Sequence, residues 1–366
     1  MRSPAPILFL ARGGALDGQQ QQVLQLASAL PALGRSAVVA VDDPGALLDE
    51  LGRRGIAAGH FPMRSWRSLT RYLPAWFDAF RLLSLARRRG VGLVHAHDHW
   101  REPYARFVAR RLSIPYVVHI RGPISVDHAR KYRLAEAGAV IAIARRYVDS
   151  LLAAGVRAER IHVVSDSVDL ARFDPARTAA ARGDASRPAT VAIVGRIDPF
   201  KRITEFVDIV AALPRALRDA TRFLVVGDEF QHDYAEAVRE RIRRNGLAGR
   251  IEFTGRVEPE RMPALLAGVD VLVTLSGGSV MFEAMAMETA VLSIRDDGRH
   301  SQFTIDGETA VCVDATKAAA ALAELIASPE KRRTLGSAGR ALVERELSTG
   351  RIAAETDAVY RSLLER

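Results

Sequence analysis

The sequence predicts an α/β protein of two doubly wound, Rossmann-like domains, each built on a parallel sheet, with a cleft between them. Short apolar runs alternate with amphipathic runs of about 10 to 15 residues along most of the chain. The alternation lapses once, and 366 residues are too many for one ordinary core. We therefore expect a first domain at 1–175, a linker at 176–189 and a second domain at 190–345. A closing helix at 346–366 packs on its own domain or returns to the first.

The expected elements follow directly from these apolar runs. In the first half, strands are expected at 6–11, 36–42, 92–97, 115–120, 138–144 and 160–167, and helices at 20–34, 103–113 and 145–155. In the second half, strands are expected at 190–195, 222–228, 251–255, 270–276, 290–294 and 310–314, and helices at 203–213, 233–245, 263–269, 282–288 and 318–328. Ligands of such sheets bind beyond the carboxyl ends of the strands.

Composition narrows the classes of partner. The net charge of +9 and a pI near 10.1 favour anionic partners such as nucleic acid, an acidic membrane or a phosphorylated substrate. The chain has no concentrated basic tail and no zinc-finger or RNP signature, so we expect no nucleic acid partner. A single cysteine excludes an internal disulfide and fits a reducing, cytoplasmic compartment. The apolar start at 6–11 is too short for a secretory signal and predicts a buried strand.

Two cations follow a strand in the segment VAIVGRIDPFKR, residues 191–202. Arg196 comes directly after the strand and its glycine, and Lys201 stands at the mouth of the next helix. Helix starts attract anions and usually carry acids, so cations there indicate a bound anion. The alternative is a solvated basic turn.

A second constellation lies at residues 270–294, which read strand, glycine turn, short helix, strand. Its glycines allow close backbone approach, its helix start offers N–H groups, and an acid one turn inside is suited to a ribose diol. That acid has a plain alternative as a helix-dipole partner. The candidate donor-binding residues here are Gly278, Ser279, Val280, Met281 and Glu283. Together with Arg196 and Lys201 they predict a nucleotide-diphosphate site.

The set of motifs resembles the GT-B glycosyltransferases of family 4 over essentially the whole chain. The resemblance rests on VGRIDPFKR, FLVVGDEF, IEFTGRVEPERMPALLAGVDVLVTLS and FEAMAMETAVLSI in the second half, and on RGGALDGQQQQVLQLASALPALG and GLVHAHD in the first. It implies that Arg196 and Lys201 bind the donor diphosphate and Glu283 the ribose. It also implies that Gly13 and Gly14 let the backbone of the first domain approach the same phosphates closely. Because RGGALDG lacks the GxGxxG spacing, a nicotinamide enzyme is disfavoured.

The activity implied by the resemblance is sugar transfer with retention of configuration. The co-substrate would be a UDP- or GDP-sugar, no cofactor would be permanently bound, and no metal would be required. The acceptor would be a hydroxyl of a glycan, a lipopolysaccharide or a lipid-linked sugar, as in surface polysaccharide assembly. Two alternatives stay open: a GT-B-shaped binding subunit without activity, and a sugar-nucleotide epimerase.

Two departures from the family pattern concern the sugar end of the site. The family usually has a glutamate eight residues before Glu283; Leu275 stands there, in a segment about four residues shorter than usual. Arg121 replaces a histidine that usually faces the reacting sugar. We expect Arg121 to add positive charge beside the diphosphate or to bind an acidic acceptor.

The segment HAHDHW, residues 95–100, concentrates histidines at the end of a strand. Alternation places His95 and His97 on one strand face, but a third metal ligand is not evident, so we expect no metal. We expect His97 to line the acceptor cleft and to join Arg196, Lys201 and Arg121 as a catalytic residue. A buried structural histidine is the alternative.

An amphipathic segment at residues 63–90 carries Trp66, Leu69, Leu73, Phe77 and Phe80 at spacings of three and four. Three arginines, Arg64, Arg67 and Arg71, surround them. One interpretation is peripheral contact with an anionic membrane. The favoured interpretation is a core-facing stripe with a solvated basic edge, interrupted at Pro74.

Overall fold

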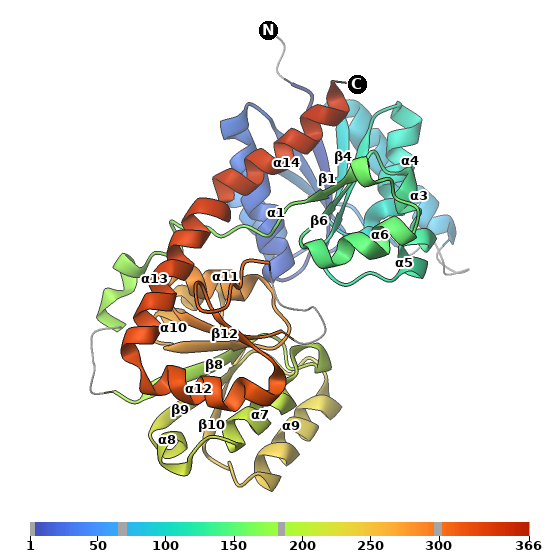
Figure 1. Ribbon diagram of the computed structural model, residues 1–366. Coiled ribbons are helices and arrows are strands. Elements are labelled where there is room, and N and C mark those ends of the chain that lie inside the picture. The colour runs from blue at the N-terminus through green and yellow to red at the C-terminus, as the bar shows by residue number, and fades with distance from the viewer. Residues whose placement is uncertain (1–3, 65–71, 182–186, 296–301, 366) are drawn as a thin grey trace. The chain divides into compact units, whose positions relative to one another are not determined.

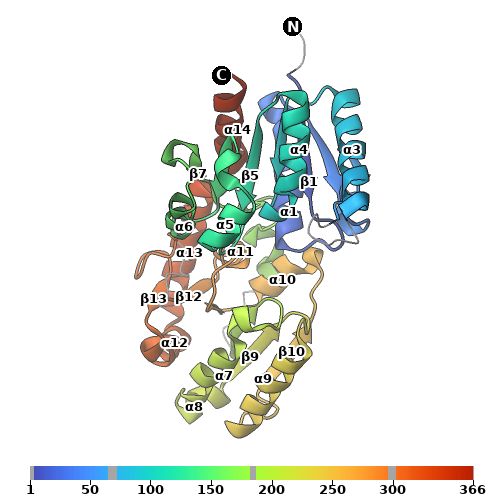
Figure 2. The same cartoon turned by 90° about the vertical axis from the view of Figure 1, so that its right-hand side faces the viewer.

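The chain folds into two compact units, each with its own parallel sheet (Figures 1 and 2). The computed structural model describes residues 4–64, 72–181, 187–295 and 302–365. The N-terminal unit is Met1–Ser167 together with Thr349–Arg366, and the C-terminal unit is Val168–Ser348. The closing helix therefore belongs to the first unit, although it follows the second along the chain.

The N-terminal unit has a seven-stranded sheet in the order β3-β2-β1-β4-β5-β6-β7. Its strands are β1 (Ile7–Ala11), β2 (Ala37–Val41), β3 (Ala57–His60), β4 (Leu93–Ala96), β5 (Tyr116–Ile120), β6 (Ala139–Ala142) and β7 (Ile161–Val163). Its helices are α1 (Gly18–Ala29), α2 (Ala46–Arg53), α3 (Tyr72–Arg89), α4 (Glu102–Leu112), α5 (Val126–Lys131), α6 (Val148–Ala153) and α14 (Thr349–Leu364). All paired strands run parallel, as the alternation predicts.

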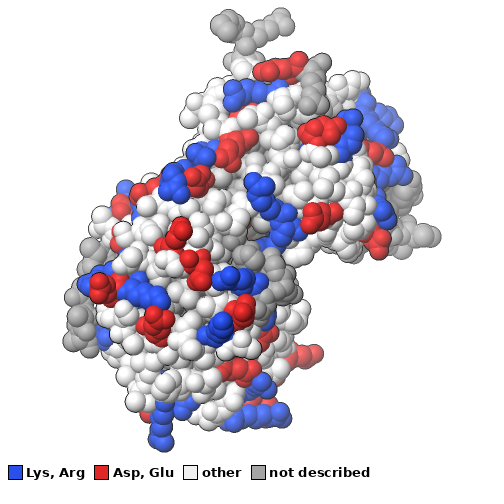
Figure 3. Space-filling view, in the orientation of Figure 1, with Lys and Arg blue, Asp and Glu red and all other residues white. Residues whose placement is uncertain are grey.

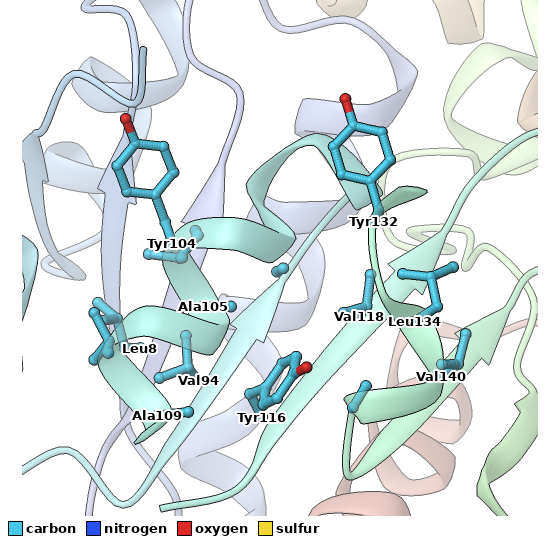
Figure 4. Close-up of a cluster of buried hydrophobic side chains, with 14 of the residues drawn as sticks. Leu8, Val94, Tyr104, Ala105, Ala109, Tyr116, Val118, Tyr132, Leu134 and Val140 are labelled. Carbon is cyan, nitrogen blue, oxygen red and sulfur yellow. The ribbon is translucent and has the colours of Figure 1, made fainter. Parts of the chain in front are cut away.

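One face of this sheet carries the main hydrophobic core. Alternate strand residues point to it, so neighbouring strands contribute side chains at the same level. Figure 4 shows Leu8, Val94 and Val118 from three neighbouring strands, with Ala105 and Ala109 of α4 beside them. Small residues on the inner side of α4 let the helix lie close to the sheet.

The opposite face is covered by α1 and α14 (Figure 1). The hydroxyl of Tyr360, on α14, lies 2.6 Å from Nδ1 of His95 in β4. A second link pairs Arg35, just after α1, with Asp357 of α14. Both links are largely buried, so α14 completes the first unit as one of its layers.

The C-terminal unit has a six-stranded sheet in the order β10-β9-β8-β11-β12-β13. Its strands are β8 (Ala189–Val194), β9 (Thr221–Val226), β10 (Ile251–Gly255), β11 (Val271–Thr274), β12 (Ala290–Ile294) and β13 (Val311–Val313). Its helices are α7 (Ile203–Ala211), α8 (Arg215–Asp219), α9 (His232–Arg244), α10 (Met262–Ala267), α11 (Ser279–Ala286), α12 (Ala318–Ala327) and α13 (Pro329–Glu346). The pairing is again parallel throughout.

The expected helix at 203–213 is confirmed as α7, and its apolar positions face the core. Ile203, Phe206, Val207 and Val210 are all buried. Helices and strands absent from the expectation are α2, β3, α5, α8 and α13. The β3 strand, AAGH, is short and alternates half-buried with exposed positions. It therefore has no apolar run from which a strand could be predicted.

The favoured interpretation of the amphipathic segment at residues 63–90, a core-facing stripe interrupted at Pro74, is wrong. Leu73, Phe77 and Phe80 are exposed on α3, whereas its core face is made of alanines and leucines. Pro74 does not interrupt this helix, because it lies in the first turn, where its missing N–H costs nothing. Trp66, Leu69, Arg67 and Arg71 lie outside the described residues. None of the described helices combines the length and hydropathy that a membrane span requires.

We expect Tyr360→Phe to destabilise the N-terminal unit by about 1 to 3 kcal/mol, because it leaves Nδ1 of His95 buried without a partner. Urea unfolding followed by tryptophan fluorescence measures this, since Trp66, Trp76 and Trp100 are the only tryptophans in the sequence. Ser362→Ala is the matched control, because that hydroxyl donates only to the carbonyl of Val359 in its own helix. Equal stability of both variants would contradict the role assigned to the buried link.

Candidate functional site

The C-terminal unit gathers its candidate residues at the switch point of its sheet. The chain leaves β8 toward β9 and β10 on one side and later returns to β11 on the other. In doubly wound sheets ligands bind at this crevice, beyond the carboxyl ends of the two central strands. Arg196 and Lys201 follow β8, and Gly278 with α11 follows β11.

Lys201 lies directly across Gly195 and reaches the start of α11. A Cβ added to Gly195 would meet Cε of Lys201 at 2.5 Å, and one added to Gly278 would lie 3.5 Å from its Nζ. Gly195 also has φ +144°, which side-chain-bearing residues rarely adopt. The glycine therefore opens the path by which the ammonium group approaches the N-terminus of α11.

Asp198 fixes the turn that carries this lysine. Its Oδ1 accepts a hydrogen bond from the backbone N–H of Lys201 at 3.1 Å and caps the short helix Pro199–Lys201. Burial lowers the pKa of Lys201, Asp198 opposes that shift, and Arg196 adds to it. A diphosphate would favour the protonated amine, because negative charge stabilises the ammonium form.

Arg196 is half-exposed and is held from two sides. Its guanidinium lies 4.3 Å from the ring centroid of Phe230, and its Nη2 lies 3.5 Å from Oδ2 of Asp198. The loops after β8 and β9 are themselves tied together, since Ile197 N–H donates to Asp228 O at 2.8 Å. The aromatic ring thus holds the planar cation at the carboxyl edge of the sheet.

The N-terminus of α11 offers backbone donors beside this lysine. Gly278, with φ +115°, is the N-cap and has no side chain to accept the first N–H groups. The N–H of Met281 donates to Gly278 O at 3.2 Å, which leaves Ser279 and Val280 as the better donors of the predicted trio. Glu283 lies one turn further along α11 and is half-buried.

Leu275 is buried in the core of the C-terminal unit, and it also lines a small cavity with Lys201 and Val280. Alternation along β11 places it with Val271 and Val273 in the hydrophobic cluster. Its backbone carbonyl accepts a hydrogen bond from Nη1 of Arg202 at 3.4 Å. Counting eight residues back from Glu283 therefore reaches a core position. How the sugar end of the site departs from the family pattern stays a prediction.

In the N-terminal unit, Gly13 and Gly14 form a tight loop after β1. A Cβ at Gly13 would lie 1.7 Å from the carbonyl oxygen of Asp43, so only glycine fits. The N–H of Gly13 donates to Asp42 Oδ1 at 2.8 Å, and that of Gly14 donates to Asp43 O at 3.2 Å. Both donors are engaged within the unit, and their part in diphosphate binding stays a prediction.

Three buried histidines stack beneath the carboxyl ends of β4 and β5. The ring centroids of His95 and His97 are 4.2 Å apart, and those of His95 and His119 are 5.4 Å apart. His97 also packs edge-on against Phe9 at 4.5 Å. The side chain of His97 is completely buried, which agrees with the alternative of a structural histidine. Its expected place in the acceptor cleft and its catalytic role stay predictions.

Arg121 joins this stack and forms an ion pair with Asp166. Its Nη1 donates to Oδ1 of Asp166 at 2.6 Å, and its Nη2 lies 3.3 Å from Nδ1 of His119 and 3.5 Å from Nδ1 of His97. Burial raises the pKa of Asp166, and the guanidinium opposes that rise. Arg121 also lines a cavity of about 10 Å³ together with Gln22 of α1 and residues of α14. Its catalytic role stays a prediction.

The histidine stack is the one group within the described ranges that offers three ligand nitrogens close together, all within 4.8 Å of one another. Its rings are nearly parallel, with interplanar angles of 18° for His95 and His97 and 9° for His95 and His119. An imidazole binds a metal in its own ring plane, so parallel rings direct their lone pairs along separate lines. The adjacent Arg121 cation also opposes a metal ion, and the expectation of no metal requirement stays a prediction.

Comparisons with known proteins identify the family. The family description "Glycosyl transferases group 1" matches residues 177–342, and "Glycosyltransferase Family 4" matches residues 16–172. The chain is 30% identical over 319 residues to 2-deoxystreptamine glucosyltransferase of Streptomyces kanamyceticus, covering 74% of this chain and 79% of that protein. It is 30% identical over 251 residues to alpha-maltose-1-phosphate synthase of Mycolicibacterium smegmatis, covering 62% of this chain and 64% of that protein.

The chain belongs to the GT-B glycosyltransferases of the family 4 type.

Solved structures agree on the fold of this glycosyltransferase. Anabaena HepE in complex with UDP and glucose has a TM-score of 0.81 at 22% identity, covering 98% of this chain and all of that one. Sucrose-phosphate synthase from Thermosynechococcus elongatus has a TM-score of 0.80 at 21% identity, covering 98% and 99% of the two chains. The prediction of a GT-B enzyme with two Rossmann-like domains is confirmed.

Three residues that support the predicted site residues Arg196, Lys201 and Arg121 were not predicted from the sequence. Phe230 carries Arg196, Asp198 caps the turn of Lys201, and Asp166 pairs with Arg121. Asp198 has a local signal, because an aspartate before proline at a helix start is a common cap. Phe230 and Asp166 have none, since each acts on a residue of a different strand loop.

The histidine stack predicts acid sensitivity of the N-terminal unit. Burial lowers the pKa of His95 from 6.5 to about 3 and lowers the pKa values of His97 and His119 well below 6.5. Above pH 6.5 these histidines are neutral in both the folded and the unfolded state, and their contribution to stability is complete. As the pH falls below 6.5, the unfolded chain binds protons at these histidines but the folded unit does not, so the contribution is lost. Each histidine contributes about 1.4 kcal/mol per pH unit in that window.

We therefore expect the urea-unfolding free energy, read by tryptophan fluorescence, to fall between about pH 6.5 and about pH 5. His119→Gln should make this slope shallower by about 1.4 kcal/mol per pH unit, because one proton-binding site of the unfolded state is removed. His232→Gln, at an exposed histidine of α9, is the control and should retain the full slope. A slope unchanged by His119→Gln would show that His119 is protonated in the folded unit.

Proposed function

We propose that this glycosyltransferase moves a sugar from a UDP- or GDP-sugar to a hydroxyl of a glycan, lipopolysaccharide or lipid-linked acceptor, with retention of configuration. One observation carries the proposal: Lys201, the N-terminus of α11 and the Arg196 guanidinium all lie at the switch point of the C-terminal sheet. This is a site built for a diphosphate, because two cations and backbone donors meet where parallel sheets bind ligands.

In the proposed reaction the bond between the sugar C1 and the diphosphate oxygen breaks, and a bond from C1 to the acceptor oxygen forms on the same face. The acceptor proton passes to the leaving phosphate. Lys201 and Arg196 neither gain nor lose a proton; they stabilise the negative charge that grows on the departing diphosphate. The Glu283 carboxylate accepts hydrogen bonds from the ribose hydroxyls. The backbone N–H groups of Ser279 and Val280 donate hydrogen bonds to phosphate oxygens.

The relatives named above act on quite different substrates, so they support sugar transfer without selecting an acceptor. The buried Arg121–Asp166 pair gives Arg121 a positioning part in the N-terminal unit, next to the loop that follows β5. We place the enzyme in the cytoplasm, at the inner face of the membrane, where nucleotide sugars and lipid-linked acceptors meet.

Arg196→Ala and Lys201→Ala should each lower the turnover of donor hydrolysis or transfer by about 100-fold or more, because each removes a preorganised charge. Release of UDP or GDP from a panel of nucleotide sugars measures this. Arg243→Ala and Lys331→Ala are matched controls, since Arg243 is exposed, Lys331 is partly exposed, and each pairs with an exposed acid. Full turnover in the double variant Arg196→Ala/Lys201→Ala would overturn the proposed function.

Phe230→Leu should weaken UDP binding by about two- to five-fold, the size of an exposed cation–π contact, while leaving the fold intact. The physical reason is that the Arg196 guanidinium loses the ring that holds it at 4.3 Å. Calorimetric titration with UDP measures the effect, and Phe77→Leu, at an exposed phenylalanine of the other unit, is the control. An unchanged UDP affinity in Phe230→Leu, alongside a large loss in Arg196→Ala, would contradict the role of Phe230.

A further inference from the structure

A stripe of large apolar side chains is exposed on α3. Leu73, Phe77 and Phe80 are 79%, 64% and 47% exposed and lie at spacings of four and three, on one side of the helix. The opposite side of α3 already fills the core through Ala75, Ala79, Leu82, Leu83 and Ala86. Contiguous exposed apolar surface of this kind marks an interaction site.

The stripe is held in place by its neighbours. The ring of Phe80 packs edge-on against Phe107 of α4 at 5.3 Å and lies 6.0 Å from Trp76. The guanidinium of Arg111 lies over both phenylalanine rings, 5.1 Å from Phe107 and 5.9 Å from Phe80. These contacts fix one end of the stripe while Leu73 and Phe77 stay open to solvent.

The charge around the stripe is positive. Arginines are exposed on α3 and at the end of α4: Arg81, Arg87, Arg88, Arg89, Arg110 and Arg111. The only acid of α3, Asp78, is buried and paired with Arg64 at 2.9 Å. The neighbouring Glu136 is already paired with Arg110 at 2.9 Å. Figure 3 shows Lys and Arg atoms gathered along the edge of the unit where α3 and α4 lie.

We propose that this α3 surface, made of Leu73, Phe77, Phe80, Arg81, Arg87 and Arg88, binds the surface of an anionic lipid bilayer. Leucine and phenylalanine side chains enter the boundary between headgroups and acyl chains, and the guanidinium groups bind lipid phosphates. A helix with an apolar stripe and basic flanks has the chemistry of an interfacial helix, and the net charge of +9 acts in the same direction.

A second copy of this chain fits the surface less well. In a two-fold dimer the same patch meets itself, which would set the arginines of α3 beside those of the partner. Like charges in contact disfavour such an interface. The bilayer interpretation does not depend on the proposed transfer reaction, since it rests on residues of α3 and α4 alone.

Co-sedimentation of the full chain with vesicles tests the proposal. We expect binding to phosphatidylcholine vesicles that contain phosphatidylglycerol, weakened by added salt, and little binding to phosphatidylcholine alone. Leu73→Ser/Phe77→Ser should weaken binding by about ten-fold or more, because the apolar insertion is lost. Arg87→Ala/Arg88→Ala should weaken it by about 30-fold, because two phosphate contacts are lost.

Two matched controls and one independent readout keep the test decisive. Leu152→Ser, at an exposed leucine of α6, controls for the apolar change, and Arg243→Ala/Arg244→Ala, on exposed arginines of α9, controls for the charge. UDP affinity should be the same in every variant, which separates this proposal from the proposed function. Equal binding to neutral vesicles, no binding to either kind, or unchanged binding by both α3 variants would overturn it. So would vesicle-free dimerisation that Leu73→Ser/Phe77→Ser abolishes, since that result assigns the surface to a second copy.

Discussion

The packing of the Lys201 side chain across Gly195 is the constraint on which the proposed diphosphate site of the C-terminal unit depends. A single added methyl at Gly195 would meet Cε of Lys201 at 2.5 Å and would push the lysine side chain off its present path. The consequence is geometric: an ammonium group that leaves one strand loop is delivered to the helix that follows another. Two sources of positive potential, a cation and a helix N-terminus, then act on the same point, where a diphosphate is favoured.

The two cations of this site are held by different means, and the difference suits their chemistry. Lys201 is a compact charge placed by a capped turn, with a pKa that burial lowers. Arg196 is a planar fork laid on the ring of Phe230 and left half-exposed, so it can turn toward phosphate oxygens without a large desolvation cost. A fixed charge and an adjustable one together suit the proposed reaction, in which negative charge grows on the departing diphosphate.

The N-terminal unit uses its buried polar groups to join layers of the fold. Neutral histidines stack on the sheet, Tyr360 of α14 closes one end of the stack, and the Arg121–Asp166 pair closes the other. Because α14 is the last helix of the chain, this network ties the end of the sequence to strands formed at its beginning. On the far side of the same sheet, α3 turns its aromatic stripe outward. One face of the sheet is thus covered by α1 and α14, and the helix α3 on the other face exposes the surface for which bilayer binding is proposed.

The sequence by itself determined the parallel α/β architecture, because the apolar periodicities of strands and helices are local. Each apolar run therefore predicts one strand or one helix without reference to the rest of the chain. It also placed Arg196, Lys201 and the start of α11 at strand ends, where position in the chain implies position in the sheet. Tertiary structure alone decided what those residues touch. Leu275 proved to be core because alternation along β11 continues past the strand. His97 proved to be buried because it packs against Phe9, His95 and His119, which come from different strands of the sheet. Phe77 proved to be exposed because the alanine face of α3, equally periodic, had already filled the core. Contacts between distant segments depend on how layers pack, and no local pattern encodes that packing.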